Sequence, residues 1–170
     1  AYPESCGRYR DDPSHGERRA EGQFDYYNLH LVFQGKGEAC VEGRWKELAE
    51  GTGFLYGPGV LQHYRTSRGD PWDVGWVHFY GSGAEQLLEG RGRGAPWLFT
   101  FGRPERVKEL TETLIRLAHP YENGSETRVA AVLYELLLEL VRGADGLASA
   151  PGLGYQDRIQ KYLPDSDVIR

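Results

Sequence analysis

Residues 54–81 read FLYGPGVLQHYRTSRGDPWDVGWVHFYG, and this stretch decides what kind of fold the chain adopts. Side chains alternate between the two faces of an extended chain. In residues 74–80 one face carries Val74, Trp76, His78 and Tyr80, and the other carries Gly75, Val77 and Phe79. A strand with Trp and His on one face is typical of a small β-barrel that holds one polar molecule. The same aromatic side chains can instead fill an apolar core, and their spacing fits both interpretations.

Further short strands, separated by glycine-rich turns, are expected before and within this stretch. They cover residues 26–33, 38–42, 44–48, 54–56 and 61–66. Two glycines in residues 34–37, and Gly43 after Glu42, supply the backbone angles of hairpin turns. Residues 57–59, Gly-Pro-Gly, interrupt the next strand. Five or more short strands at this spacing favour a β-sandwich or β-barrel over a parallel sheet.

After residue 81 the hydrophobic period changes from two to about 3.6, which indicates helices. Helices are expected over residues 82–88, 104–119 and 125–142. Residues 91–102 are expected to be extended and loop-like. Ser82 starts the first helix with a capping-box pattern, and Pro104 suits the first turn of the second. Pro120 and Gly143 then act as stop signals.

The composition limits the class of function. A chain of 170 residues is long enough for one domain with its own core. Its net charge of −5 makes it a poor electrostatic match for nucleic acid, so we do not expect this segment itself to bind DNA. The longest apolar run, residues 130–138, is interrupted by Glu135, so no membrane span is expected. No signal peptide is visible, and a cytoplasmic location is expected, with Cys6 and Cys40 as free thiols; a disulfide between them is the alternative.

The third expected helix carries apolar residues on two sides. One stripe contains Val129, Val132, Leu133, Leu136, Leu137, Leu140 and Val141, and the second contains Ala131, Tyr134 and Leu138. A helix that is apolar on two sides must be buried on two sides. A second copy of the same helix can cover one side in a symmetric dimer. We assign this contact to Leu133, Leu136, Leu137, Leu140 and Tyr134. The alternative is that both stripes are covered within one chain.

The order of the motifs resembles the N-terminal effector-binding domain of AraC-family transcriptional regulators. The shared marks are an arginine before the strand DYYNLH, the GKG turn, FLYGPG, then HY, then PW followed by WVHFYG. These marks cover roughly half of the chain in the family's order, and together they are specific. The resemblance implies an α+β, mainly β fold, with a cupin-like antiparallel β-barrel or jelly roll followed by C-terminal helices.

The resemblance also implies how the chain is divided. Residues 1–143 correspond to the effector-binding and dimerisation domain, with the barrel over residues 1–81 and the helices over residues 82–143. Residues 144–155 are expected to be a linker of small residues, and residues 156–170 the start of a helix-turn-helix DNA-binding domain that is cut short. The implied function is to sense a small molecule, often a sugar in this family. As a homodimer, the domain would thereby control DNA binding by the missing part.

Effector contacts follow from the resemblance residue by residue. Arg19 matches the family arginine on the first barrel strand, although its neighbour Arg18 fits the alignment as well. Tyr64 matches a tyrosine that hydrogen-bonds the sugar in the arabinose-responsive member. Trp76 matches the tryptophan on which that sugar stacks. Tyr9 matches a position in the N-terminal arm of the family.

Two further positions decide how far the resemblance extends. Val74 stands where the arabinose-responsive member has a sugar-binding histidine, which puts arabinose itself in doubt. His78 lies two residues past Trp76 on the same face and can supply polarity instead, or it can be a core histidine with a satisfied hydrogen bond. The arm, residues 2–13, is expected to fold over the effector or to shift when it binds.

Two other functions stay open at this point. Cupin-type enzymes usually hold iron or manganese with a His-x-His pair, a Glu and another His. The five histidines of this chain show no such spacing, and His63, near the usual second-motif position, lacks partners. A stand-alone carbohydrate-binding module is the other alternative, but it needs neither a two-sided helix nor a linker. We therefore expect no enzyme activity, metal or cofactor, and the sequence does not name the effector.

Overall fold

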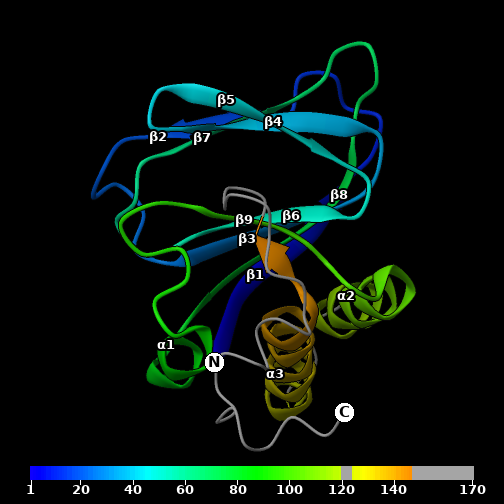
Figure 1. Cartoon of the computed structure of the whole chain (residues 1–170). Helices are drawn as coiled ribbons and strands as arrows, with labels where there is room; N and C mark the ends of the chain where they lie inside the picture. Colours follow the sequence, from blue (N-terminus) through cyan, green and yellow to red (C-terminus); the bar gives the residue numbers. More distant parts are fainter. Residues whose placement is uncertain (120–123, 147–170) are drawn as a thin grey trace, which may run out of the picture.

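The computed structural model describes residues 1–119 and 124–146. The expected stop at Pro120 and the expected helix-turn-helix start at residues 156–170 lie outside these ranges. The ten described strands form two antiparallel sheets that face each other, and the helices lie beneath the larger sheet (Figure 1). This is the mainly β fold followed by helices that the sequence predicts, in the two-sheet form of a jelly roll.

The elements are bounded as follows. The six-stranded sheet contains, in spatial order, β1 (Tyr2–Tyr9), β8 (Asp73–Tyr80), β3 (Tyr27–Gln34), β6 (Thr52–Tyr56), β9 (Trp97–Thr100) and β10 (Asp145–Gly146). The four-stranded sheet contains β2 (Gly16–Arg19), β7 (Gln62–Thr66), β4 (Lys36–Val41) and β5 (Arg44–Ala49). The helices are α1 (Ser82–Leu88), α2 (Pro104–Ala118) and α3 (Glu126–Gly143).

The predicted alternation along β8 is confirmed. Val77 and Phe79 belong to the core between the six-stranded sheet and the helices, whereas Val74 belongs to the core between the two sheets. Trp76 lies opposite His30 of β3 and Gly7 of β1, so all three positions face the four-stranded sheet. Gly7 makes room for the indole, because a Cβ there would lie 2.8 Å from a ring carbon of Trp76. The sheet register therefore aims Trp76 between the two sheets.

The hairpin between β4 and β5 forms at the predicted turn. Glu42 and Gly43 both adopt positive φ, at 52° and 77°. A two-residue turn whose twist matches that of the flanking strands requires positive φ at both positions. The predicted helix starts are also found, at Ser82 and Pro104. The predicted capping box is not: Gly81 is the N-cap of α1, and no side-chain hydrogen bond caps this helix.

Two expected boundaries, at residues 81 and 144, were wrong, and the expected arm contains a strand of the predicted β part. Residues 97–100, within the expected loop, form β9 and pair with β6, so the β part of the fold extends beyond residue 81. Residues 2–9 of the expected arm form β1, which pairs with β8 from Tyr2 to Tyr9. Residues 144–146 of the expected linker also belong to the fold, because Ala144 is buried and β10 pairs with β9. The rest of that linker lies outside the described residues.

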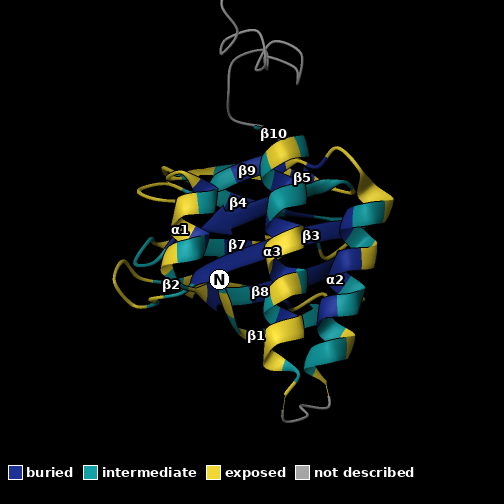
Figure 2. Cartoon of the chain, turned by 90° about the horizontal axis from the view of Figure 1, so that it is seen from below, coloured by how far each residue is buried: buried dark blue, intermediate teal, exposed yellow. Residues whose placement is uncertain are grey.

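Helix α3 corrects the predicted dimer contact. Leu133, Leu136, Leu137 and Leu140 are at most 1% exposed in the single chain, where they pack in the core beneath the six-stranded sheet. Each such leucine contributes roughly 1.5–3 kcal/mol through burial of its apolar surface. Of the five residues assigned to the dimer, only Tyr134 is exposed, at 47%. Figure 2 shows this outward side of α3, with its exposed residues turned away from the sheet.

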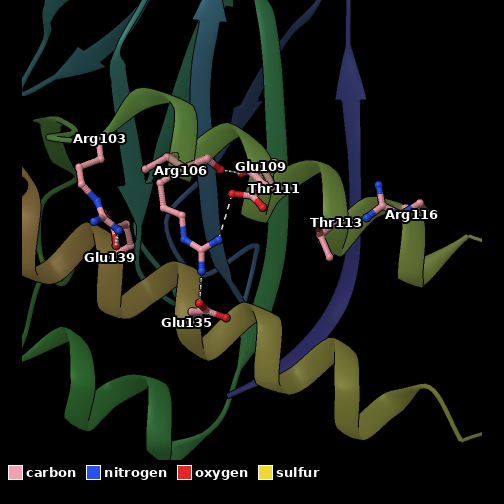
Figure 3. A network of polar contacts seen from close by, with 9 residues as sticks. Arg103, Arg106, Glu109, Thr111, Thr113, Arg116, Glu135 and Glu139 are labelled. Atoms are coloured by element: carbon pink, nitrogen blue, oxygen red, sulfur yellow. Dashed lines mark hydrogen bonds and ion pairs between the residues drawn. The ribbon is translucent and has the colours of Figure 1, made fainter.

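Ion pairs join α3 to α2 along one edge of this outward side (Figure 3). Arg103 contacts Glu139 with two hydrogen bonds of 2.6 and 3.0 Å. Arg106 contacts both Glu109 of its own helix and Glu135 of α3. Exposed pairs of this kind contribute roughly 0–1 kcal/mol each, so the buried leucines hold the helices in place.

Candidate functional site

Polar side chains from both sheets meet between them. Arg19 of β2 donates hydrogen bonds from Nη1 to Oε1 of Gln62 at 2.9 Å and to the hydroxyl of Tyr64 at 3.3 Å. Asn28 of β3 donates from Nδ2 to the same Gln62 oxygen at 2.8 Å. Asn28 and Gln62 are fully buried, and Tyr64 is 2% exposed. A network that crosses from one sheet to the other thus occupies a place where apolar residues would normally pack.

Several polar atoms of this region have no hydrogen-bond partner. They are Oδ1 of Asn28, Nδ1 of His30 and Nε2 of Gln62, all shielded from solvent. Leaving one such group unpaired costs about 1–3 kcal/mol, and in most proteins nearly all buried polar groups are paired. Three in one place, two on β3 and one on β7 of the facing sheet, are the pattern of a site that is completed by a ligand or by water.

Aromatic rings lie beside the polar network. Trp76 is half-buried, and its ring centroid lies 4.8 Å from that of His78 and 6.4 Å from that of Tyr9. Phe24 contacts His78 edge-on at 4.8 Å, and the guanidinium of Arg19 lies 4.7 Å from the Phe24 ring centroid. Arg19, Trp76 and His78 are all half-buried, so they form the accessible side of the cluster, whereas Asn28 and Gln62 form its buried side.

His15 connects this cluster to the end of β1. Its ring stacks on Tyr9 with centroids 3.8 Å apart, and Nε1 of Trp72 donates a hydrogen bond of 2.9 Å to its Nδ1. An indole N–H can only donate, so Nδ1 carries no proton and His15 is neutral. Burial lowers the pKa of His15 to about 4, which agrees with this assignment.

Burial also keeps the other two histidines neutral. It lowers the pKa of His78 to about 4, and the positive charge of Arg19 contributes to this shift. The pKa of His30 lies well below its usual value because of burial and of the nearby His15, His78 and Arg19. At neutral pH the guanidinium of Arg19 is therefore the charged group within the cluster.

The structure brings together all five residues predicted for effector binding. Tyr64, Trp76 and His78 point between the sheets, and Tyr9 reaches the same region from the end of β1. Of the two candidate arginines, Arg19 is the one that lies at the cluster, opposite Gln62. Arg18 is exposed and lies opposite His63 on the outer face of the sheet.

Four members of the cluster were not predicted from the sequence: His15, Asn28, His30 and Gln62. Asn28 and His30 alternate with apolar residues along β3, so a polar pair at positions i and i+2 in a buried strand was the available signal. Gln62 stands two residues before Tyr64 on the same strand, which was a similar signal. His15 lies in a turn, and no periodic pattern could have indicated its position.

A groove of about 890 Å³ lies over the outer face of the four-stranded sheet, and its lining includes His15 and Tyr64 of the inter-sheet cluster. Its lining includes charges of both signs, Arg18, Lys36, Arg65, Arg68, Glu17, Glu38 and Glu47. Arg65 also pairs with Glu38 at 2.6 Å and covers the ring of Trp45 at 4.0 Å. This groove lacks the unpaired buried atoms of the inter-sheet cluster.

Within residues 1–119 and 124–146, no group of three His, Cys, Asp or Glu side chains comes together as metal ligands would. None of the helices described there is long and apolar enough to cross a membrane. Both Cys6 and Cys40 are free thiols, and burial raises the pKa of Cys6 to about 11.

One curated relative is the Msm operon regulatory protein of Streptococcus mutans serotype c. It is 28% identical over 118 residues, which cover 69% of this chain and 42% of the relative. The chain thus spans less than half of that regulator.

Solved structures of AraC-like regulators share the fold. The AraC-like transcriptional activator CuxR superposes with a TM-score of 0.57 at 14% identity, over 88% of this chain and 56% of CuxR. ToxT K231A from Vibrio cholerae, in its apo form, superposes with a TM-score of 0.53 at 10% identity, over 76% of this chain and 52% of ToxT. At these identities the comparison concerns the fold alone.

The family comparison covers most of the chain. The model of the AraC-like ligand binding domain matches residues 3–137, a range that includes both sheets up to β9, all three helices in whole or in part, and every residue of the inter-sheet cluster. The chain therefore belongs to the family of AraC-like ligand binding domains.

Proposed function

We propose that this domain senses a small, hydroxyl-rich effector, of which a sugar is the simplest kind, between its two sheets. The observation that carries the proposal is the set of unpaired polar atoms on Asn28, His30 and Gln62, beside Arg19 and the half-buried ring of Trp76. In this proposal the domain has no catalytic role, and binding energy is used for regulation.

The chemistry of the unpaired atoms favours hydroxyl groups. Oδ1 of Asn28 can only accept and Nε2 of Gln62 can only donate, whereas a hydroxyl group does both. A sugar ring also has an apolar face of C–H groups that suits the flat indole of Trp76. A carboxylic acid is the other class to consider, because ToxT of Vibrio cholerae O395 has been solved bound to (E)-4-(8-methylnaphthalen-1-yl)but-3-enoic acid. The mixed polar lining favours the sugar class for this chain.

Regulation would act on a DNA-binding domain outside the described residues. An effector changes such a domain only if it binds two arrangements of the protein with unequal affinity. Strand β1 provides a physical connection, because Tyr9 contacts the site whereas the preceding Arg8 pairs with Asp73 and with Glu112 of α2. We propose that effector binding alters the docking of β1, and through it the helix layer.

A homodimer formed through α3 is part of the same proposal. With its leucines buried in the chain, the available surface is the outward side around Tyr134, with the exposed Ala131 and the half-buried Leu138 beside it. These positions are spaced three and four residues apart and form one stripe. An isologous contact between two copies of α3 would cover it.

A thermal-shift screen tests the effector site. The panel contains neutral sugars, sugar acids and aromatic or long-chain carboxylic acids, with divalent metal ions as a separate arm. Ligands that bind the native state raise the melting temperature by mass action. We expect a sugar-class shift that is lost in Trp76→Ala and kept in Trp45→Ala, which removes an indole from the outer face instead. A shift that Trp76→Ala leaves intact would place the ligand elsewhere, and a metal-dependent shift would favour the cupin-enzyme alternative.

A further inference from the structure

We infer that the effector is an anionic sugar derivative, a polyhydroxy carboxylate such as a sugar acid, whose carboxylate binds Arg19. This inference rests on the proposed function, because it specifies the chemical class of the ligand held at that site. It differs from the expectation of a neutral sugar, and it follows from the charge of the cluster.

Arg19 has no acidic partner among the described residues. Its hydrogen bonds go to the neutral groups of Gln62 and Tyr64, and it takes part in none of the ion pairs found within the described ranges. The half-buried Arg8 shows the contrast, because it pairs with both Asp73 and Glu112. Arginine in a partly buried position is usually compensated in this way. In the inter-sheet cluster the compensation has to come from elsewhere.

The surrounding groups do not supply a negative charge. His15, His30 and His78 are neutral at pH 7, as described above, and tyrosine keeps its proton, since burial raises the pKa of Tyr64. Three carboxylates lie near the cluster. Asp12 lies close enough to His15 to act on its charge, Glu4 lies 3.8 Å from Nδ1 of His78, and Glu17 lies on the same strand as Arg19, opposite Tyr64. None of the three pairs with Arg19, so the guanidinium has no carboxylate in contact with it.

This charge selects between two kinds of hydroxyl-rich ligand. A ligand that covers Arg19 removes water from the guanidinium, and a neutral ligand leaves that desolvated charge without a counter-charge. A carboxylate supplies the counter-charge and can accept two parallel N–H hydrogen bonds from the guanidinium fork. The same bound ligand can then direct its hydroxyl groups to Asn28 and Gln62 and its ring face to Trp76. Asn28 and Gln62 would contribute their unpaired polar atoms, and Arg19 and Trp76 their partly exposed side chains.

Paired ligands test the inference by isothermal titration calorimetry. The probes are D-galacturonate against D-galactose and D-glucuronate against D-glucose, which differ only in the carboxylate. We expect at least one acid to bind about tenfold to a hundredfold more tightly than its neutral partner, as a charged hydrogen-bond pair provides. The variants are Arg19→Gln, Arg19→Lys and Arg18→Gln, the last of which removes the same charge from the outer face of the same strand.

The pattern over the variants decides the outcome. Arg19→Gln should remove the preference for the acid, because the acid loses more affinity than its neutral partner. Arg19→Lys should keep part of the preference, and Arg18→Gln should keep all of it. Equal or tighter binding of a neutral sugar, lost in Trp76→Ala, would overturn the anionic class but keep the proposed site. Acid binding that survives both Arg19→Gln and Trp76→Ala would overturn both. Failure of both acids to bind would overturn the inference as well.

Discussion

Gly37 illustrates how closely single residues are fitted around the site. A Cβ at this position would lie 2.3 Å from two ring carbons of the buried Trp72 and 2.6 Å from a backbone oxygen of Arg65. We expect Gly37→Ala to destabilise the fold by about 1–3 kcal/mol, because neither neighbour can move freely. Gly69→Ala is the control, since nothing lies within 4 Å of its Cβ position. Urea denaturation of the two variants measures the difference, and equal stability would contradict the packing described for Trp72.

The buried histidines predict how stability depends on pH. The folded-state pKa values of His15 and His78, about 4, lie below the ordinary value of 6.5. Between pH 6.5 and 4 the unfolded chain therefore binds more protons than the folded one, so stability falls as the pH falls through this window. Denaturation curves at several pH values measure this loss, and His78→Gln should make the slope shallower. A stability that is constant over the window would show that these histidines are not held neutral.

At the scale of elements, the outward side of α3 carries the dimer proposal. Tyr134→Glu places a charge in the centre of the stripe, so we expect it to give monomers by light scattering with native circular dichroism. Tyr80→Glu is the matched control, because Tyr80 is also 47% exposed but lies at the end of β8. A dimer that persists in Tyr134→Glu, or a chain that is monomeric from the start, would contradict the proposal.

Strand β1 depends on Arg8, which joins it to β8 and α2. Arg8 is 13% exposed and holds Asp73 with hydrogen bonds of 2.6 and 2.8 Å. We expect Arg8→Gln to cost about 1–3 kcal/mol and to speed hydrogen exchange of the β1 amides. Arg10→Gln, whose side chain is 61% exposed and 3.8 Å from the same carboxylate, should change stability by less than about 0.5 kcal/mol. Unchanged exchange in Arg8→Gln would mean that backbone pairing alone holds β1.

The elements differ in how far the sequence could predict them. β8 and α3 were predictable, because their apolar residues repeat with the period of a strand and of a helix over many positions. β1 was not, since Pro3, Glu4 and Ser5 interrupt any alternation and the strand is defined by pairing with β8 instead. β9 contains only four residues, too few for a period. The helix pattern indicated two apolar sides on α3, but only the fold determines which side meets the sheet.

At the scale of the molecule, the family motifs predicted some residues of the inter-sheet cluster but not those of its buried side. Arg19, Tyr64 and Trp76 were predicted because they lie in sequence motifs of the family. Asn28 and Gln62 each stand in a polar pair at positions i and i+2, but the contact of 2.8 Å that joins them across the two sheets is not encoded by either strand alone. The charge argument for Arg19 likewise depends on the absence of an acidic partner in three dimensions within the described ranges, and no spacing along the chain indicates it.

The central claim is that the effector binds between the two sheets, and the four tryptophans test it directly. Their indole N–H signals in a ¹H–¹⁵N correlation spectrum report on distinct places: Trp76 in the cluster, Trp72 behind His15, Trp45 on the outer face and Trp97 on β9. During titration with the sugar or sugar acid of largest thermal shift, the Trp76 signal should move and saturate while those of Trp45 and Trp97 stay in place. Movement of Trp45 with an unchanged Trp76 would contradict the account.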